Sequence, residues 1–220
     1  MDMTNTTYDT ILYPGQALAQ AHPDRLAILA VLFGLSAPKV ETSRILELGC
    51  GDGLNLISVA LSLPEAMCVG IDLAEGGIKK GQTCIQELGL KNIQLQQYDV
   101  LEIDSNFGQF DFIIAHGLYS WVPEHVRDKI LSICKTNLAE KGVAYISYNT
   151  YPGAYLRNMV RDMMRYHVGE METAQQKIEQ ARAFVEFIAD SARDDSEVYR
   201  PLLLKERERI RGFLDSSLFH

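Results

Sequence analysis

The chain of 220 residues has few cysteines, and their arrangement suits neither a metal site nor a disulfide framework. The four of them, Cys50, Cys68, Cys84 and Cys134, lie far apart in the sequence, and none forms the C-x-x-C pair typical of zinc sites and redox motifs. We therefore expect reduced thiols, a cytoplasmic location and no bound metal.

The sequence also lacks an apolar run long enough to cross a membrane, and its beginning lacks the basic-then-apolar pattern of a signal peptide. Basic residues are in the minority: 21 Lys and Arg stand against 29 Asp and Glu, for a formal net charge of -8. Nucleic-acid phosphates attract clustered basic residues, so we expect neither nucleic acid nor a membrane as partner. The remaining composition is that of a globular protein.

Glycine, by contrast, occupies three alternate positions in one stretch, R-I-L-E-L-G-C-G-D-G-L-N at residues 44–55. An apolar run stops there at Gly49, Gly51 and Gly53, and a helix-compatible run follows. This pattern predicts a strand, a tight turn and a helix, because glycine permits positive φ and a close approach of a ligand to the backbone. The free amides at the start of the helix favour a negatively charged group such as a carboxylate.

The turn alone is compatible with a dinucleotide or with a ligand that has no pyrophosphate. A dinucleotide-binding turn has glycines in the pattern G-x-G-x-x-G, followed about twenty residues later by an acid that binds the ribose. Here Leu54 occupies the third glycine position, which argues against a pyrophosphate and hence against a nicotinamide oxidoreductase. The acid is present as Asp72, at the end of a second apolar strand.

Strand and helix patterns alternate along most of the chain. Strands are expected at residues 45–48, 67–72, 93–98, 110–115 and 143–148, and helices at 23–34, 54–63, 74–88 and 123–138. In the first helix, Leu26, Leu29, Ala30 and Phe33 form an apolar stripe that we expect to cover the sheet. Such alternation predicts the α/β class: a doubly wound, mainly parallel, Rossmann-like sheet that binds its ligand at the carboxyl ends of the strands.

From residue 153 the pattern changes to about three amphipathic helices without a strand signal. We predict a domain at residues 1–152 followed by a helical extension at 153–220. We interpret the methionines of the first extension helix as core residues, and we expect that the extension could join two copies of the chain in a homodimer.

Four motifs follow one another at the spacing of β/α units: E-L-G-C-G-D-G at 47–53, G-I-D-L at 70–73, Asp99-Val100, and F-D-F-I-I-A-H-G at 110–117. Together they resemble the class I S-adenosylmethionine-dependent methyltransferases. The stretches H-G-L-Y-S-W-V-P and S-Y-N-T-Y-P-G further resemble a bacterial group in which this module precedes a "methyltransferase regulatory domain". That group includes protein-lysine methyltransferases.

The resemblance implies that the chain binds S-adenosylmethionine. The turn at Gly49, Cys50 and Gly51 would meet the methionine part of this cofactor. Glu47 and Asn55 would hold waters or the amino-acid end of the cofactor.

The nucleoside half of the cofactor is assigned in the same way. Asp72 would accept hydrogen bonds from the ribose hydroxyls, and Asp99 would accept one from the adenine amine. Leu73 and Val100 would sandwich the adenine ring. For each acid, the alternative interpretation is a helix-capping or solvated carboxylate.

The methyl acceptor would lie near His116 and Tyr119, the candidate catalytic residues. His116 could take up a proton near neutral pH, although the favoured interpretation is a structural histidine whose neighbouring backbone touches the cofactor. Tyr13, from a lid-like N-terminal segment, and His116 complete the expected cofactor contacts.

A complete class I sheet has two further strands after the fifth, and this chain has helices in their place. We expect those strands either beyond residue 220 of a longer protein or lost in a diverged form. The leading hypothesis is methyl transfer to protein side chains such as lysine. The alternatives are a small-molecule methyltransferase, or a cofactor-binding and oligomerisation module of a larger methyltransferase with little activity of its own.

Overall fold

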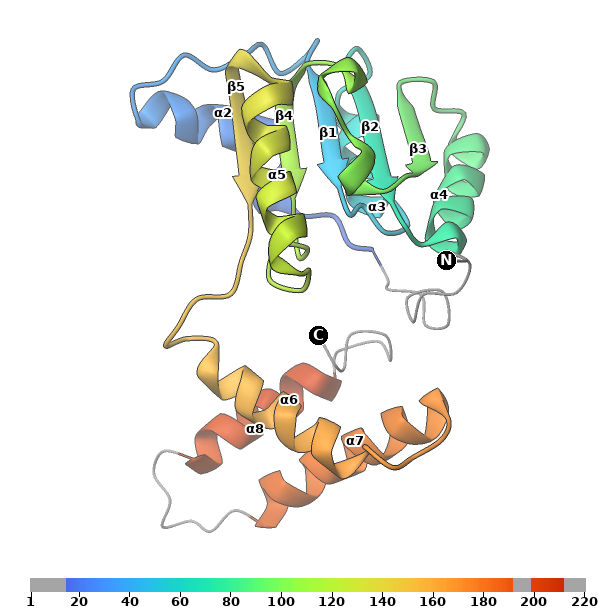
Figure 1. Cartoon of the computed structure of the whole chain (residues 1–220), viewed down its shortest axis with the longest axis vertical. Helices are drawn as coiled ribbons and strands as arrows, with labels where there is room; N and C mark the ends of the chain where they lie inside the picture. The colour runs from blue at the N-terminus through green and yellow to red at the C-terminus, as the bar shows by residue number, and fades with distance from the viewer. Residues whose placement is uncertain (1–14, 192–198, 212–220) are drawn as a thin grey trace. The chain divides into compact units, whose positions relative to one another are not determined.

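A computed structural model describes residues 15–191 and 199–211 (Figure 1). These residues fall into two compact units, which divide between Tyr148 and Asn149. The first unit holds a sheet with its covering helices, and the second holds three helices. The predictions for Tyr13 lie outside the described residues.

The sheet of the first unit has five parallel strands in the order β3-β2-β1-β4-β5. Their bounds are β1 (Arg44–Leu48), β2 (Met67–Asp72), β3 (Ile93–Gln97), β4 (Phe110–Ala115) and β5 (Leu138–Ile146). The strand order reverses at β1, which lies between β2 and β4, so the switch point of the doubly wound sheet is at the carboxyl end of β1. This topology confirms the predicted fold class.

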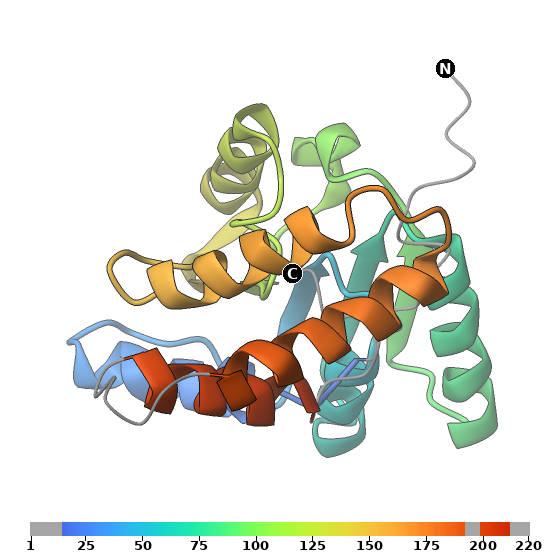
Figure 2. The same cartoon turned by 90° about the horizontal axis from the view of Figure 1, so that it is seen from below.

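Helices cover both faces of this sheet (Figure 2). One face carries η1 (Ala19–Ala21), α2 (Pro23–Leu32), α3 (Leu54–Ser62) and α4 (Glu75–Leu88), and the other carries η2 (Val100–Glu102), η3 (Ser105–Phe107) and α5 (Glu124–Asn137). Neighbouring residues of β1 point to opposite faces: Ile45 packs in the cluster on the α3 side and Leu46 in the cluster on the α5 side. Burial on both faces explains why the strands read as apolar runs.

The fifth strand differs from its prediction. The sequence pattern predicts residues 143–148, whereas β5 spans Leu138–Ile146 and follows α5 without a loop. Phe110 and Phe112, two apart on β4, pair with Leu138 and Val143, which are five apart on β5. The intervening residues therefore bulge out of the ladder, and this irregularity hides the first half of the strand from a period-two pattern.

The apolar stripe of α2 covers the sheet only in part. Leu26 and Ala30 are buried, but Leu29 is 42% exposed and Phe33 is 84% exposed. Figure 1 shows the reason: α2 reaches past the edge strand β5, so its last turn has none of the described strands beside it. The expectation that all four residues cover the sheet is therefore wrong for Leu29 and Phe33.

The second unit consists of α6 (Tyr155–His167), α7 (Ala174–Ser191) and α8 (Tyr199–Arg211). This confirms the predicted change to helices. The unit has a hydrophobic core of its own, to which Val160, Ala181, Val185 and Leu203 contribute. Met164 is 2% exposed within this core, as expected of a core methionine, but Met163 is 36% exposed, so the expectation is wrong for Met163. No helix in residues 15–191 and 199–211 is long and apolar enough to cross a membrane.

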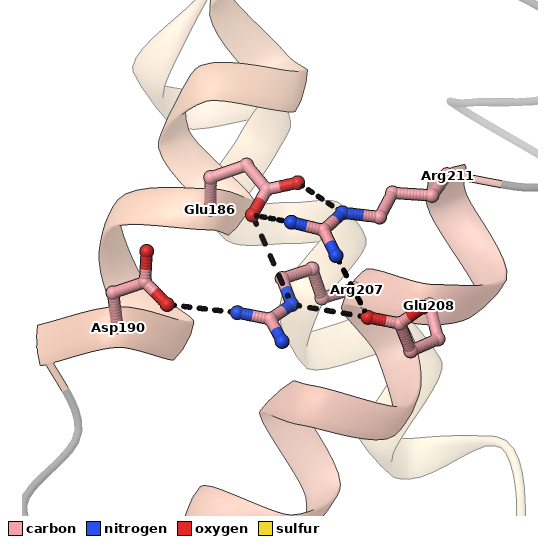
Figure 3. Close-up of polar contacts among 5 residues, drawn as sticks. All are labelled: Glu186, Asp190, Arg207, Glu208 and Arg211. Carbon is pink, nitrogen blue, oxygen red and sulfur yellow. Dashed lines mark hydrogen bonds and ion pairs between the residues drawn. The ribbon is translucent and has the colours of Figure 1, made fainter.

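Ion pairs align α7 with α8 (Figure 3). Arg211 holds both carboxylate oxygens of Glu186, at 2.6 and 2.8 Å. Arg207 contacts Asp190 at 2.7 Å, and Glu208 lies between the two arginines. Because most of these side chains are exposed, the network fixes the register of the two helices more than it stabilises the fold.

Two glycines allow α4 to approach the glycine turn closely. A Cβ at Gly77 would lie 3.0 Å from the carbonyl oxygen of Gly51, and a Cβ at Gly81 would overlap the carbonyl oxygen of Asp52. The two glycines are four residues apart and therefore share one face of the helix. They set the distance between α4 and the turn.

Replacing Gly81 with alanine should destabilise the protein by about 1–3 kcal/mol, the usual cost of forcing extra atoms into a packed site. Helix propensity alone would stabilise the same variant by about 1 kcal/mol, so the sign of the change separates the two effects. Urea unfolding measures it, with Glu87→Ala on the exposed side of α4 as the control. An unchanged or higher urea midpoint for Gly81→Ala would show that α4 has room to shift.

Candidate functional site

The glycine turn after β1 is held against the end of β2. Gly49, Gly51 and Gly53 have φ angles of 70°, 59° and 71°, in the left-handed region that favours glycine. The N–H groups of Gly49 and Cys50 donate to the carbonyl oxygen of Ile71, at 2.9 and 3.0 Å. A Cβ built at Gly51 would meet no atom within 4 Å. The turn therefore leaves open space beside Gly51 for a ligand.

Asp72, the last residue of β2, ties the turn to the neighbouring strand. Its Oδ2 accepts from the Gly51 N–H, and its Oδ1 accepts from the Ala74 N–H, both at 2.8 Å. A carboxylate has about four acceptor positions. The two protein bonds therefore fix the orientation of Asp72 and leave it capacity for the two hydroxyls of a ribose.

Asp99 reaches the same edge of the sheet from the next strand. The N–H of Tyr98 donates to the carbonyl oxygen of Asp72 at 3.0 Å, which places Asp99 one residue beyond this junction. Its Oδ1 accepts from the Leu101 N–H at 2.8 Å and so caps η2. The capping role considered from the sequence is therefore present, and it uses one of the two carboxylate oxygens.

The two apolar residues expected to sandwich an adenine each follow one of these acids. Leu73, after Asp72, is 44% exposed. Val100, after Asp99, is half-buried against the core on the α5 side. Apolar surface next to both carboxylates is what a flat heteroaromatic ring with polar edges would cover.

Glu47 is a carboxylate in the central strand and only 4% exposed. Its Oε1 accepts from Asn55 Nδ2 at 2.9 Å, and its buried Oε2 has no hydrogen-bond partner among the described residues. Burial is the main cause that raises the pKa of Glu47 to about 7; the Asn55 bond opposes this, and the charge of Asp72 adds to it. Buried polar atoms normally have partners, so the orphaned oxygen fits an ammonium group on a ligand.

The side chains of Cys50 and Asn55 are directed into the protein. The Cys50 sulfur packs over Gly70 of β2, so this residue presents its backbone to the turn. Asn55 donates to Glu47 and accepts from the Leu18 N–H at 2.9 Å. A direct contact between Asn55 and a cofactor stays a prediction.

The two candidate catalytic residues make separate contacts. His116 Nδ1 lies 3.3 Å from the Tyr145 hydroxyl, and the two rings are parallel within 9°. Burial lowers the pKa of His116 and raises the pKa of Tyr145, so His116 is neutral at pH 7. Tyr119 is half-buried on the α5 side of the sheet, with its ring centroid 6.0 Å from that of Tyr148.

The sequence reasoning missed Asp52, which is 6% exposed. Its Oδ1 accepts from the Leu54 N–H at 3.2 Å, at the start of α3, and its Oδ2 pairs with Lys80 of α4 at 2.8 Å. A signal was available, because Asp is a preferred residue at the start of a helix and Asp52 lies inside the glycine motif. Tyr145 was missed as well, although it lies in a strand that ends at the same edge as His116.

Comparison with known proteins assigns the chain to a family. Residues 39–201 match the family described as "Methyltransferase domain". The chain belongs to this family. The predicted recognition, the class I S-adenosylmethionine-dependent methyltransferases, is thereby confirmed.

Three relatives resemble the methyltransferase along nearly its whole length. PKMT2 from Rickettsia typhi, solved in complex with AdoHcy, has a TM-score of 0.83 and 36% identity over 94% of this chain and 40% of its own. RP789 from Rickettsia prowazekii is 43% identical over 97% of this chain and 38% of its own length. RP028 from the same organism is 36% identical over 97% of this chain and 86% of its own length. The chain therefore spans about two-fifths of PKMT2 and RP789.

Neutralising the buried acid should make the stability of the methyltransferase less dependent on pH. The raised pKa means that Glu47 contributes stability that is fully present below pH 4.5 and is lost as the pH rises through about 7. Relative to the wild type, Glu47→Gln should therefore gain about 2–3 kcal/mol between pH 5 and pH 8.5.

Urea unfolding at the two pH values measures this difference. The exposed Glu87→Gln serves as the control and should follow the wild type. A gap between Glu47→Gln and the wild type that does not change with pH would show that Glu47 ionises as an ordinary carboxyl group.

Proposed function

We propose that this methyltransferase binds S-adenosylmethionine at the carboxyl edge of its sheet and transfers the methyl group to the side-chain amine of a protein lysine. The likeness to PKMT2 carries the proposal, because it covers 94% of the chain and so extends beyond the sheet into the helices. PKMT2 was solved with AdoHcy, the product of methyl donation, which supports the donor half. The resemblance to a group that includes protein-lysine methyltransferases supports the acceptor half.

The chemistry of the site fits the methionine part of the donor. The unsatisfied Oε2 of Glu47 would accept from its ammonium group. The open backbone at Gly51 would lie beside its amino-acid end, since a ligand there meets no Cβ. Gly49 and Cys50 would hold the shape of the turn through their bonds to Ile71.

The nucleoside part would be held by the residues after β2 and β3. Asp72 would accept from the ribose hydroxyls with the capacity that its two backbone bonds leave. Leu73 and Val100 would contact the faces of the adenine. Asp99 would accept from the adenine amine through the oxygen that does not cap η2.

When bound, the donor supplies a methyl group that its sulfonium already activates, so the protein has to align the partners and exclude water. A lysine amine must lose its proton before it can attack, because the ammonium form has no lone pair. His116 is neutral at pH 7, and in the tautomer whose Nδ1–H donates to the Tyr145 hydroxyl its Nε2 has the free lone pair, so Nε2 is the atom we assign as proton acceptor.

Donor binding is tested by replacing Asp72 with asparagine. The loss of charge-assisted bonds to the ribose should weaken AdoHcy binding about 10- to 100-fold, as measured by isothermal titration calorimetry. Asp111→Asn is a matched control, because Asp111 also accepts from a backbone N–H, that of Arg44 at 2.8 Å, but at the opposite end of β1. Equal affinity of the wild type and Asp72→Asn would remove Asp72 from the donor site.

Acceptor class is tested with methyl-labelled donor in a cell extract separated into proteins and small molecules. We expect label on lysine side chains of proteins, and less of it with Asp72→Asn at the same donor concentration. Label confined to the small-molecule fraction would favour the small-molecule alternative. Tight AdoHcy binding without any labelled acceptor would favour a cofactor-binding module with little activity of its own.

A further inference from the structure

Asn55 joins three segments that are far apart in the sequence. It lies in the first turn of α3, donates from Nδ2 to Glu47 of β1 at 2.9 Å, and accepts at Oδ1 from the N–H of Leu18 at 2.9 Å. All three residues are buried, with 5%, 4% and 8% of their surface exposed, respectively. The segment before η1 is thus connected to the acid of the site through one side chain.

The two partners determine which way the amide of Asn55 lies. A backbone N–H can only donate, so the amide oxygen must face Leu18 and the amide nitrogen must face Glu47. Because Oε1 of Glu47 is occupied in this way, Oε2 is the atom left for a ligand. Asn55 therefore orients the carboxylate without needing to touch the ligand.

A second contact holds the same segment against the glycine turn. Gly15 lies directly against the carboxylate of Asp52, and a Cβ at this position would be 2.8 Å from the Cβ of Leu54. Leu18 is buried in the cluster that also contains Leu56 of α3. Residues 15–18 are therefore docked at the start of α3, beside the turn.

We propose that Asn55 is a positioning residue that couples the docking of residues 15–18 to the orientation of the Glu47 carboxylate, so that this segment tightens when the methyl donor binds. The proposal rests on the proposed function, because the donor's ammonium is the group that Glu47 would receive.

The coupling follows from the two consecutive hydrogen bonds that run from the Leu18 N–H through the Asn55 amide to Glu47. An ammonium next to Oε2 favours the ionised form of Glu47, and the bond from Asn55 Nδ2 then becomes charge-assisted. A stronger bond at one end of an amide polarises the group and strengthens the bond at its other end, here the bond from the Leu18 N–H. By reciprocity, a docked segment raises the affinity for the donor by the same factor.

The test is amide hydrogen exchange at Leu18, together with AdoHcy affinity from calorimetry. Saturating AdoHcy should slow exchange of the Leu18 amide about ten-fold in the wild type. Asn55→Ala should remove this slowing and weaken AdoHcy binding about ten-fold. Asn92→Ala is the matched control, because Asn92 donates to the carbonyl oxygens of Ala60 and Leu63 at the far end of α3, and it should leave both quantities unchanged.

A second variant keeps the proposal testable if Asn55→Ala does not fold. Gly15→Ala displaces the segment while Asn55 and Glu47 stay intact, and it should also weaken AdoHcy binding and reduce the slowing at Leu18. Unchanged AdoHcy affinity in the folded variants, or wild-type Leu18 exchange that AdoHcy does not affect, would overturn the coupling while donor binding stands. A wild-type protein that does not bind AdoHcy would instead overturn the proposed function.

Discussion

A hydrogen bond from the Gly51 N–H to the Asp72 carboxylate, at 2.8 Å, orients the acid that the site presents to a ligand. It joins the turn after β1 to the end of β2, and it depends on a φ of 59° that favours glycine. The carboxylate is therefore oriented before any ligand arrives. A ligand that binds there loses less free energy in ordering the side chain than it would with a freely rotating acid.

The charges at this edge also agree with the donor. Glu47, Asp72 and Asp99 gather at the ends of three adjacent strands, whereas Asp52 is paired with Lys80. Acids that have no ion-pair partner in the described part of the chain favour a cationic ligand. S-adenosylmethionine carries a sulfonium and an ammonium, and its product has lost the sulfonium charge, so the same field favours the exchange of product for fresh donor.

Sequence patterns predicted the elements whose structure depends on neighbouring residues in the chain. They did not predict features that depend on contacts between distant residues. The turn, the strands that end at Asp72 and before Asp99, and the change to helices follow from local patterns of glycine and apolar residues. The bulged start of β5 does not, because its pairing with β4 is set by the sheet rather than by its own residues. The link from Leu18 through Asn55 to Glu47 spans residues that only the folded chain brings together, and no spacing rule reveals it.

The central place of β1 in the sheet affects which parts of such a protein can evolve. This strand is paired on both sides and buried on both faces, so its amides should be among the last to exchange with solvent. The residues proposed to lie near the acceptor, His116 and Tyr119, follow β4 instead and contact Tyr145 and Tyr148, in and just after β5 at the rim of the sheet. Substitutions at the rim of the sheet can change the substrate while the rigid centre keeps the same donor. One architecture can therefore serve many methylation reactions.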